Sequence, residues 1–302
     1  MTIYIDDKIT KTTNENTNAE NSQSIYIRQS KTQPQTLKDL NFTDVSKIEN
    51  ENTCFESHKD FGYFLFLLPS YDLTEPKSER VEIYLSPKTM LLFYDEPSPI
   101  VERWLEIFLS SDEKTNSVKK ALFSFLSLLG TRYIVSLDAI EDKITDLEDA
   151  VANEETEDYV SEIRILRKQL LTLRRHYESM LALLEDLEEN RNGLLTDDEL
   201  RQLHFQTQKV ERLHRSTLNL RDYLTQVREA YQALLDIEAN KVMKLFTVIT
   251  SIFLPLTLLV GWYGMNLAMP ETTFPQTYPI VIIASILIVV GLIIYFKRNK
   301  WF

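Results

Sequence analysis

The feature that most constrains this chain is a long uncharged run of residues near its C-terminal end. It extends from Leu245 to Pro270, and a second uncharged run, from Thr272 to Phe296, follows after a single glutamate. Uncharged runs of about 18 residues or more are typical of membrane-spanning helices. The sequence therefore predicts two C-terminal transmembrane helices, over residues 241–263 and 279–296, joined by a loop over residues 264–278.

The distribution of basic residues predicts which way these helices cross the membrane. Lys241 and Lys244 precede the first span, and Lys297, Arg298 and Lys300 follow the second. The loop between the spans has no basic residue. Because basic residues tend to stay on the cytoplasmic side, we expect a multi-pass protein of the plasma or inner membrane with both termini in the cytoplasm. The loop then lies outside, and residues 297–302 form a basic cytoplasmic tail.

The N-terminal part of the chain divides into two regions. Residues 1–60 are polar and poorly patterned, although two alternating pieces, Thr2–Ile5 and Ser24–Ile27, are predicted to pair as a hairpin. Residues 61–116 combine three short apolar or alternating runs with a helix that starts after Pro97, which indicates a small α/β subdomain. The runs predicted as strands are Phe61–Leu68, Val81–Leu85 and Thr89–Tyr94.

Residues 117–240 are predicted to be almost wholly helical. Apolar residues recur every three or four positions, as in a coiled-coil seam, over residues 137–151, 163–187 and 210–234. No proline or glycine lies between Thr196 and Leu254, so the third helix is predicted to continue into the first span over about 65 residues, roughly 100 Å. The predicted fold is therefore an α/β cytoplasmic domain, a long-helix coiled-coil stalk and two transmembrane helices.

The charge of the chain limits its partners. A formal net charge of -12 argues against non-specific binding of nucleic acid, which needs a basic surface. Acidic residues crowd the segment from Asp138 to Glu162, where Lys143 is the only basic residue; a solvated helical hairpin and a surface that concentrates cations both explain them. The sequence has no phosphate-binding loop, nucleophile elbow or paired Cys/His set, so it predicts neither an enzyme nor a bound cofactor.

One stripe of the first span is suited to line a pore. Two spans from one chain cannot enclose a water-filled path, so a pore requires an oligomer. The stripe residues are spaced alternately by three and four positions, and they are Asn240, Met243, Thr247, Thr250, Leu254, Thr257 and Gly261. Small and hydroxyl residues also line ordinary contacts between membrane helices, so packing explains the stripe as well as a pore does.

The helix that precedes the first span carries three carboxylates in the same heptad phase as this stripe. They are Asp222, Glu229 and Asp236, each seven residues from the next. In a symmetric ring of chains each would form a circle of carboxylates, an arrangement that cation pathways use. A solvated helix face is the alternative, and the shared phase favours the pathway.

The first span ends on a turn that offers oxygen ligands. Gly264 and Met265 precede Asn266, whose side chain has a neutral carbonyl oxygen and an amino group, and Glu271 adds one carboxylate to the same loop. Magnesium prefers oxygen ligands and keeps several of its waters, so a ring of such amides suits a hydrated ion held through outer-sphere contacts. Three such residues recur by chance, so only their context can identify ion entry and selection at this loop.

In this context the turn resembles the signature of the CorA family of divalent-metal channels and transporters. The resemblance is carried by Tyr263-Gly264-Met265-Asn266, Met269-Pro270-Glu271, Asn240–Lys244, Phe253–Thr257 and Lys297–Phe302. Weaker similarity brings its extent to roughly residues 60–302. It implies a funnel-shaped homopentamer whose first span lines the pore, with Asn266 as selectivity element at the outer mouth. It also implies transport of mainly Mg²⁺, and in some members of Co²⁺, Ni²⁺ or Zn²⁺.

The sequence departs from the family pattern in three places. The family's HPL-type stretch has no clear counterpart around Thr36–Ser46, and the outer loop is one residue short with a single acid. The start of the third long helix reads His204-Phe205-Gln206-Thr207-Gln208-Lys209, where many members carry acidic residues. An inter-subunit regulatory metal site therefore lacks its expected carboxylates there.

We predict a channel-type transporter that moves divalent cations, chiefly Mg²⁺, into the cytoplasm down the membrane potential. A zinc, cobalt or nickel transporter of the same family is one alternative. The amide, hydroxyl, thioether and carboxylate groups of the proposed pore, without His or Cys, favour a hard ion. A membrane-tethered coiled-coil scaffold or sensor without transport is the other alternative.

Overall fold

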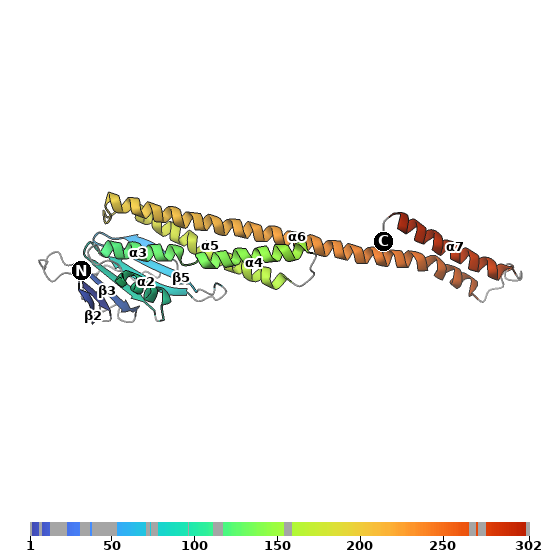
Figure 1. The fold of residues 1–302 in the computed structure, drawn as a ribbon, viewed down its shortest axis with the longest axis horizontal. Coiled ribbons are helices and arrows are strands. Elements are labelled where there is room, and N and C mark those ends of the chain that lie inside the picture. The colour runs from blue at the N-terminus through green and yellow to red at the C-terminus, as the bar shows by residue number, and fades with distance from the viewer. Residues whose placement is uncertain are drawn as a thin grey trace. The chain divides into compact units, whose positions relative to one another are not determined.

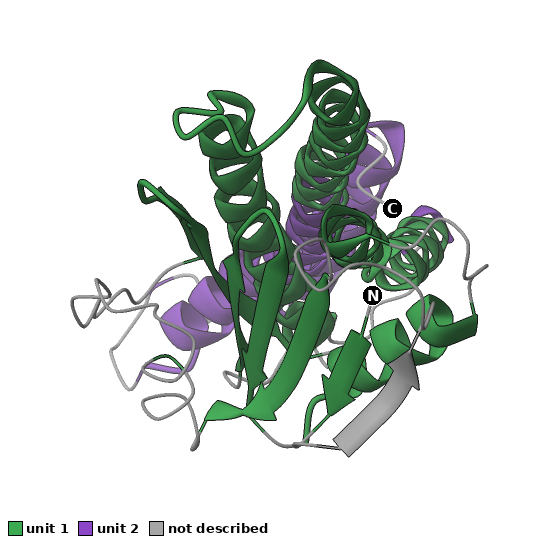
Figure 2. Ribbon diagram, turned by 90° about the vertical axis from the view of Figure 1, so that its left-hand side faces the viewer, with its two compact units in different colours: residues 1–150, 157–227 green, residues 151–156, 228–302 purple. Residues whose placement is uncertain are grey.

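The chain folds into two compact units, which Figure 2 shows in different colours. The first comprises Met1–Ala150 and Glu157–Val227, and the second comprises Val151–Thr156 and Arg228–Phe302. The computed structural model describes residues 2–5, 8–12, 23–30, 37, 53–70, 73, 78–95, 97–110, 117–153, 159–265, 270 and 276–299.

The first unit is built on a seven-stranded sheet with the strand order β2-β1-β3-β7-β6-β5-β4. β3 lies parallel to both β1 and β7, and the other neighbours are antiparallel. The strands predicted between residues 61 and 94 are confirmed as β5, β6 and β7. The full set is β1 (Thr2–Ile5), β2 (Lys8–Thr12), β3 (Ser24–Gln29), β4 (Cys54–Ser57), β5 (Gly62–Pro69), β6 (Ser78–Leu85) and β7 (Thr89–Tyr94).

The hairpin predicted between the first two alternating pieces is wrong. Both pieces are strands, but β1 and β3 run parallel, with Ile3 opposite Ile25, and β2 is the antiparallel partner of β1. A tight hairpin joins only antiparallel strands, whereas parallel strands need a longer crossover. Alternation identifies a half-buried strand and does not identify its partner. The sheet therefore begins at residue 2, and the predicted subdomain boundary at residue 61 falls inside it.

Both faces of the sheet are buried, which explains why β5 is a continuous apolar run. On one face the Phe66 ring lies 5.6 Å from the Phe125 ring of α3, which in turn lies 5.6 Å from the Trp104 ring of α2. Figure 1 shows α2 (Pro99–Ser110) and α3 (Val118–Thr131) beside the sheet. The other face carries a buried cluster of Phe61, Tyr63, Leu65, Tyr84, Leu91 and Phe93.

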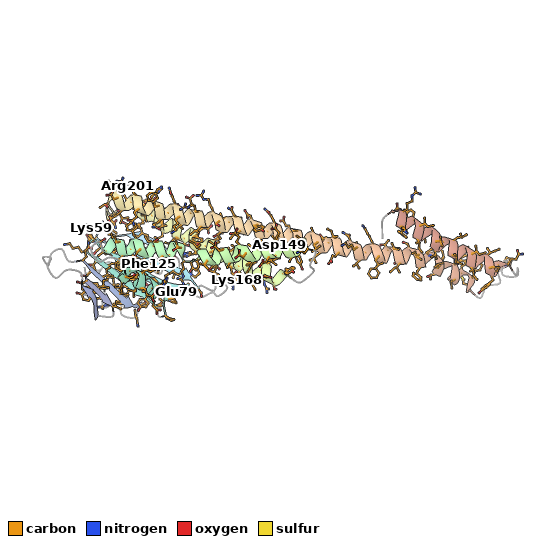
Figure 3. All side chains as sticks on the ribbon, viewed as in Figure 1. Lys59, Glu79, Phe125, Asp149, Lys168 and Arg201 are labelled. Atoms are coloured by element: carbon orange, nitrogen blue, oxygen red, sulfur yellow. The ribbon has the colours of Figure 1, made fainter. Side chains whose placement is uncertain are left out.

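Two carboxylates on β6 have partners that the sequence pattern did not predict. Glu82, only 4% exposed, accepts hydrogen bonds from the hydroxyls of Tyr63 and Tyr84 and from Arg80 Nε, which lies 2.9 Å from its Oε1. Glu79, labelled in Figure 3, pairs with the fully buried Arg132 side chain at 2.5 Å. Buried charges need such partners, because an unpaired one costs several kcal/mol.

The helical seams predicted from the apolar rhythm are confirmed in the first unit. α4 (Ile134–Ala152) buries Leu137, Ile140, Ile144 and Leu147, and α5 (Val160–Glu188) buries every seam position from Ile163 to Leu187. The connection to α6 contains two residues with positive φ, Asn190 and Gly193. At its end the Glu199 side chain reaches back to Thr196, and its Oε2 accepts from the backbone N–H and the hydroxyl of Thr196 at 2.8 and 2.9 Å, as in half of a capping box.

The long third helix is also confirmed. α6 runs from Asp197 to Tyr263 as one helix of 67 residues, with Pro255 inside it, and α7 follows over Thr277–Arg298. Residues 197–227 of α6 belong to the first unit and residues 228–263 to the second, so the predicted boundary at residue 240 does not interrupt the helix.

Three helical segments among the described residues are long and apolar enough to cross a membrane. In α6 and α7 only 6% of the most apolar window is buried, whereas in Val118–Ala152 half of it is buried. That third segment includes Leu122, Phe125 and Leu126, which are core residues of the first unit. We therefore assign it to the soluble core, and α6 and α7 are the two candidates for membrane spans.

Candidate functional site

All seven residues of the predicted stripe are exposed on α6 within the second unit. Met243 is 63% exposed and Leu254 68%, values that an ordinary soluble core would not allow. A Cβ atom added at Gly261 would meet nothing within 4 Å. The stripe is therefore free of intrachain packing, and the chain itself supplies no helix that would account for its small residues.

The threonine hydroxyls of the stripe donate hydrogen bonds to the helix backbone. Thr247, Thr250 and Thr257 donate their O–H groups to carbonyl oxygens four residues earlier, at 2.8, 2.7 and 2.8 Å. A hydroxyl that donates in this way keeps its oxygen lone pairs as acceptors. Each threonine therefore offers an oxygen that can accept a hydrogen bond from the water shell of a cation.

The upper part of the stripe borders a shallow hollow of about 390 Å³. Its lining is mostly apolar and consists of Leu254, Thr257, Leu258, Gly261, Trp262 and Met265. Three of these residues belong to the stripe, and Met265 belongs to the turn that follows it. The structure thus places the end of the stripe next to the first residues of the Gly-Met-Asn turn.

The turn itself requires glycine at its first position. The Gly264 N–H donates to Val260 O at 2.8 Å, and a Cβ atom added to Gly264 would lie 2.8 Å from that same oxygen. Because the obstructing atom belongs to the backbone, a larger residue would force the turn to shift. Gly264 and Met265 are exposed, while Asn266 and Glu271 lie outside the described residues.

The three carboxylates predicted to face a pathway are exposed on α6, but one of them already has a partner. Asp222 Oδ1 lies 2.8 Å from Arg221 Nη2 of the same chain. The next residue, Tyr223, donates its hydroxyl to Glu148 of α4, and this hydrogen bond raises the tyrosine pKa. Sequence periodicity does not reveal either contact, because both depend on side-chain reach. Glu229 and Asp236 have no ion pair within 4.0 Å among the residues that the structure describes.

The acidic segment of α4 does not gather into a metal site within one chain. Nowhere in the described part of the structure do three or more His, Cys, Asp or Glu side chains converge as metal ligands. The start of α6 offers only Glu188 near His204, at 3.7 Å, beside the exposed ring of Phe205.

These features define a class of protein before any comparison. An α/β unit is followed by two exposed apolar helices, and in the sequence Gly264, Met265 and Asn266 come directly after the first of them. The sequence matches the family model described as CorA-like Mg2+ transporter protein over residues 24–298. The chain therefore belongs to the CorA-like family, whose members are membrane transporters rather than enzymes, as the turn and stripe motifs predicted.

Individual relatives agree with this assignment. The cobalt/magnesium transport protein CorA of Thermotoga maritima is 28% identical over 252 residues, which are 82% of this chain and 72% of that protein. The magnesium transport protein CorA of Salmonella typhimurium is 30% identical over 194 residues, 57% of this chain and 60% of that protein. The solved structure of the CorA magnesium transporter from Methanocaldococcus jannaschii has the same fold, with a TM-score of 0.77 at 20% identity over 92% of this chain and 90% of that one.

Proposed function

We propose that this protein is a homopentameric channel that carries divalent cations, chiefly Mg²⁺, through the membrane into the cytoplasm. The first span, residues 241–263, lines the pore, and the second, residues 279–296, packs outside it. The outer loop selects the ion. The protein lies in the plasma or inner membrane, with both termini in the cytoplasm. Membership of the CorA-like family supports the transport of divalent cations.

The observation that carries the proposal is the exposure of the whole polar stripe on α6. Apolar residues of a lone span can face lipid, but an amide and three hydroxyls in one line gain nothing from hydrocarbon. In a ring of chains the same line faces water, and Met243 and Leu254 form its two apolar constrictions. The oxygen acceptors of the threonines then meet the water shell of the passing ion.

The driving force for entry is electrostatic. Moving one elementary charge through 100 mV releases about 2.3 kcal/mol, and a divalent cation releases twice that. Exposed carboxylates at Glu229 and Asp236 lie in heptad phase with the stripe, and in a pentamer they attract the ion toward the cytoplasmic end. Asp222 contributes less than the other two, because Arg221 of the same chain compensates its charge.

The experiment that tests the proposal is flux through purified protein in liposomes. Asn266→Ala should reduce Mg²⁺ uptake at least tenfold, because the loop loses its amide ring. The matched control is Asn219→Ala, which removes an exposed amide of α6 in the first unit and should leave uptake unchanged. Uptake by Asn266→Ala equal to that of the parent would show that selection occurs elsewhere.

Cobalt is the second candidate substrate. The Thermotoga maritima relative is named as a cobalt/magnesium transport protein. The oxygen groups of the stripe, which contains no His or Cys, favour the harder Mg²⁺, so Co²⁺, Ni²⁺ or Zn²⁺ should compete with Mg²⁺ uptake only weakly. Uptake measured with the four ions in competition ranks them directly.

The mass of the complex in detergent checks the number of chains. A dimer would exclude the pore.

A further inference from the structure

One face of α6 carries two lysines and a buried valine in line. Lys241, Lys244 and Val248 are spaced by three and four positions, so they share a face. Val248 is 2% exposed and is the only buried residue of α6 between positions 235 and 263. Successive residues of an α-helix are rotated by about 100° around its axis. This face therefore lies roughly 100° around the helix from the nearby part of the pore stripe. The lysines therefore belong to a surface other than the proposed ion path.

The end of α7 lies at the level of these lysines. Within the second unit, Figure 1 shows α7 running back beside the end of α6. Phe296 is 19 residues after the start of α7 (296 − 277), and Lys244 is 19 residues before the end of α6 (263 − 244). At 1.5 Å per residue each is about 28 Å from the helix ends that the outer loop joins. Phe296, 6% exposed, is the only buried residue of α7.

Four cations therefore lie at the same level along the two helices. Lys297 and Arg298 directly follow Phe296, and both are exposed, as are Lys241 and Lys244. Basic residues in the last turn of α7 complement the helix dipole, but Lys241 and Lys244 lie inside a continuous helix and have no such reason to be there. Neither α6 beyond Lys244 nor α7 contains a carboxylate. We name Lys241, Lys244, Lys297 and Arg298 the basic collar.

We propose that the basic collar binds the headgroup phosphate of an anionic phospholipid. The collar lies at one end of the two apolar helices, at the level where lipid headgroups meet water. The ring of Tyr295, 60% exposed, stands beside it, as aromatic residues do at that level. Apolar surface on one side and four cations on the other match a lipid, whose tails and phosphate are joined in one molecule. A free phosphate would satisfy only the cations.

The test measures lipid selectivity and needs no flux, so it fails or succeeds independently of the proposed transport activity. The full chain is reconstituted in phosphatidylcholine vesicles, and spin-labelled phosphatidylglycerol and phosphatidylcholine are compared by their relative association constants. The parent should prefer the anionic lipid several-fold at low salt, by about fivefold for each cation that contacts the headgroup. The preference should fall in 1 M NaCl, where charges are screened within about 3 Å.

The decisive variant is Lys244→Gln/Arg298→Gln, which should bring the two association constants close to equal. Arg212→Gln/Arg228→Gln removes the same charge from exposed positions of α6 outside the collar and should keep the preference. Lys244→Arg/Arg298→Lys should keep it as well, and circular dichroism verifies that each variant folds. Equal constants in the parent, or equal losses in both neutralised variants, would overturn the proposal. Displacement of the labelled lipid by 10 mM inorganic phosphate would also overturn it, because the ligand would then be free phosphate.

Discussion

The two units treat their apolar residues in opposite ways. In the first, Phe64, Phe66 and Leu92 are fully buried between sheet and helices. In the second, Phe253, Leu254 and Leu258 are 62–69% exposed, although the segment around them is more apolar. The first unit thus buries its hydrophobic groups within one chain, whereas the second leaves them exposed, as membrane-spanning helices do.

The units also differ in how they use charge. The first unit buries Glu82 and Arg132, and each has a charged partner, Arg80 for Glu82 and Glu79 for Arg132. The described part of the second unit beyond Lys244 has no carboxylate, and its cations gather at the helix ends. Charge in the first unit therefore contributes to a specific fold, and charge in the second contributes to the placement of helices in a membrane.

The strongest test of this contrast compares two phenylalanines. Phe125→Ala should lower the free energy of unfolding by about 4 kcal/mol, because it leaves a cavity between Phe66 and Trp104. Phe253→Ala, in the exposed part of α6, should change it by less than about 0.5 kcal/mol in detergent. Denaturant unfolding of both full-length variants measures the difference. Equal losses would mean that the second unit has a core of its own.

The buried ion pair should have the next largest effect. Arg132→Ala removes a fully buried guanidinium and leaves Glu79 with Ser98 as its remaining hydrogen-bond donor, so we expect a loss of about 3 kcal/mol. Arg191→Ala is the control, because the Arg191–Glu189 pair is exposed and should contribute less than about 1 kcal/mol. Urea midpoints of the two variants provide the comparison. Similar midpoints would show that burial does not strengthen the pair.

A buried histidine should make the first unit sensitive to acid. Burial, and then the nearby charge of Arg132, lowers the pKa of His176 to about 3, below the value of about 6.5 in an unfolded chain. Between these two pKa values the unfolded state binds more protons than the folded state. The contribution of His176 to stability is therefore fully present above pH 6.5, and it decreases by about 1.4 kcal/mol for each unit by which the pH falls below that value. Unfolding curves at pH 7 and pH 5 should differ by about 2 kcal/mol more in the parent than in His176→Phe. The same substitution at the exposed His204 should retain the parent's pH dependence.

The smallest effect concerns the start of α6. Thr196→Ala removes one of the two hydrogen bonds that Glu199 accepts from this residue, and we expect a loss of about 1 kcal/mol. Glu199 also pairs with Lys119 at 2.8 Å, so Glu199→Gln should cost somewhat more than Thr196→Ala. Thermal melting resolves the two variants. The opposite order would mean that the Lys119 pair contributes little.

Much of the fold follows from local periodicity. The steps of three and four residues predicted the buried faces of α4, α5 and α6. The family followed from a short motif in a long apolar context. The pairing of β1 with β3 did not follow, because an alternating strand accepts a partner in either direction. Nor did the partners of Asp222 and Tyr223, which lie one side chain apart on α6 but contact different residues.

The sequence by itself determined the properties that reside in one segment: where the apolar helices lie, which residues share a face, and where charge is missing. These properties depend on the periods of helices and strands, which are the same wherever a segment lies in the fold. Only the tertiary structure decided that Val118–Ala152 is core rather than a membrane span, and that Val248, on the face of Lys241 and Lys244, is buried. Both outcomes depend on which distant surface covers a given face, and that choice minimises the free energy of the whole chain rather than of any segment.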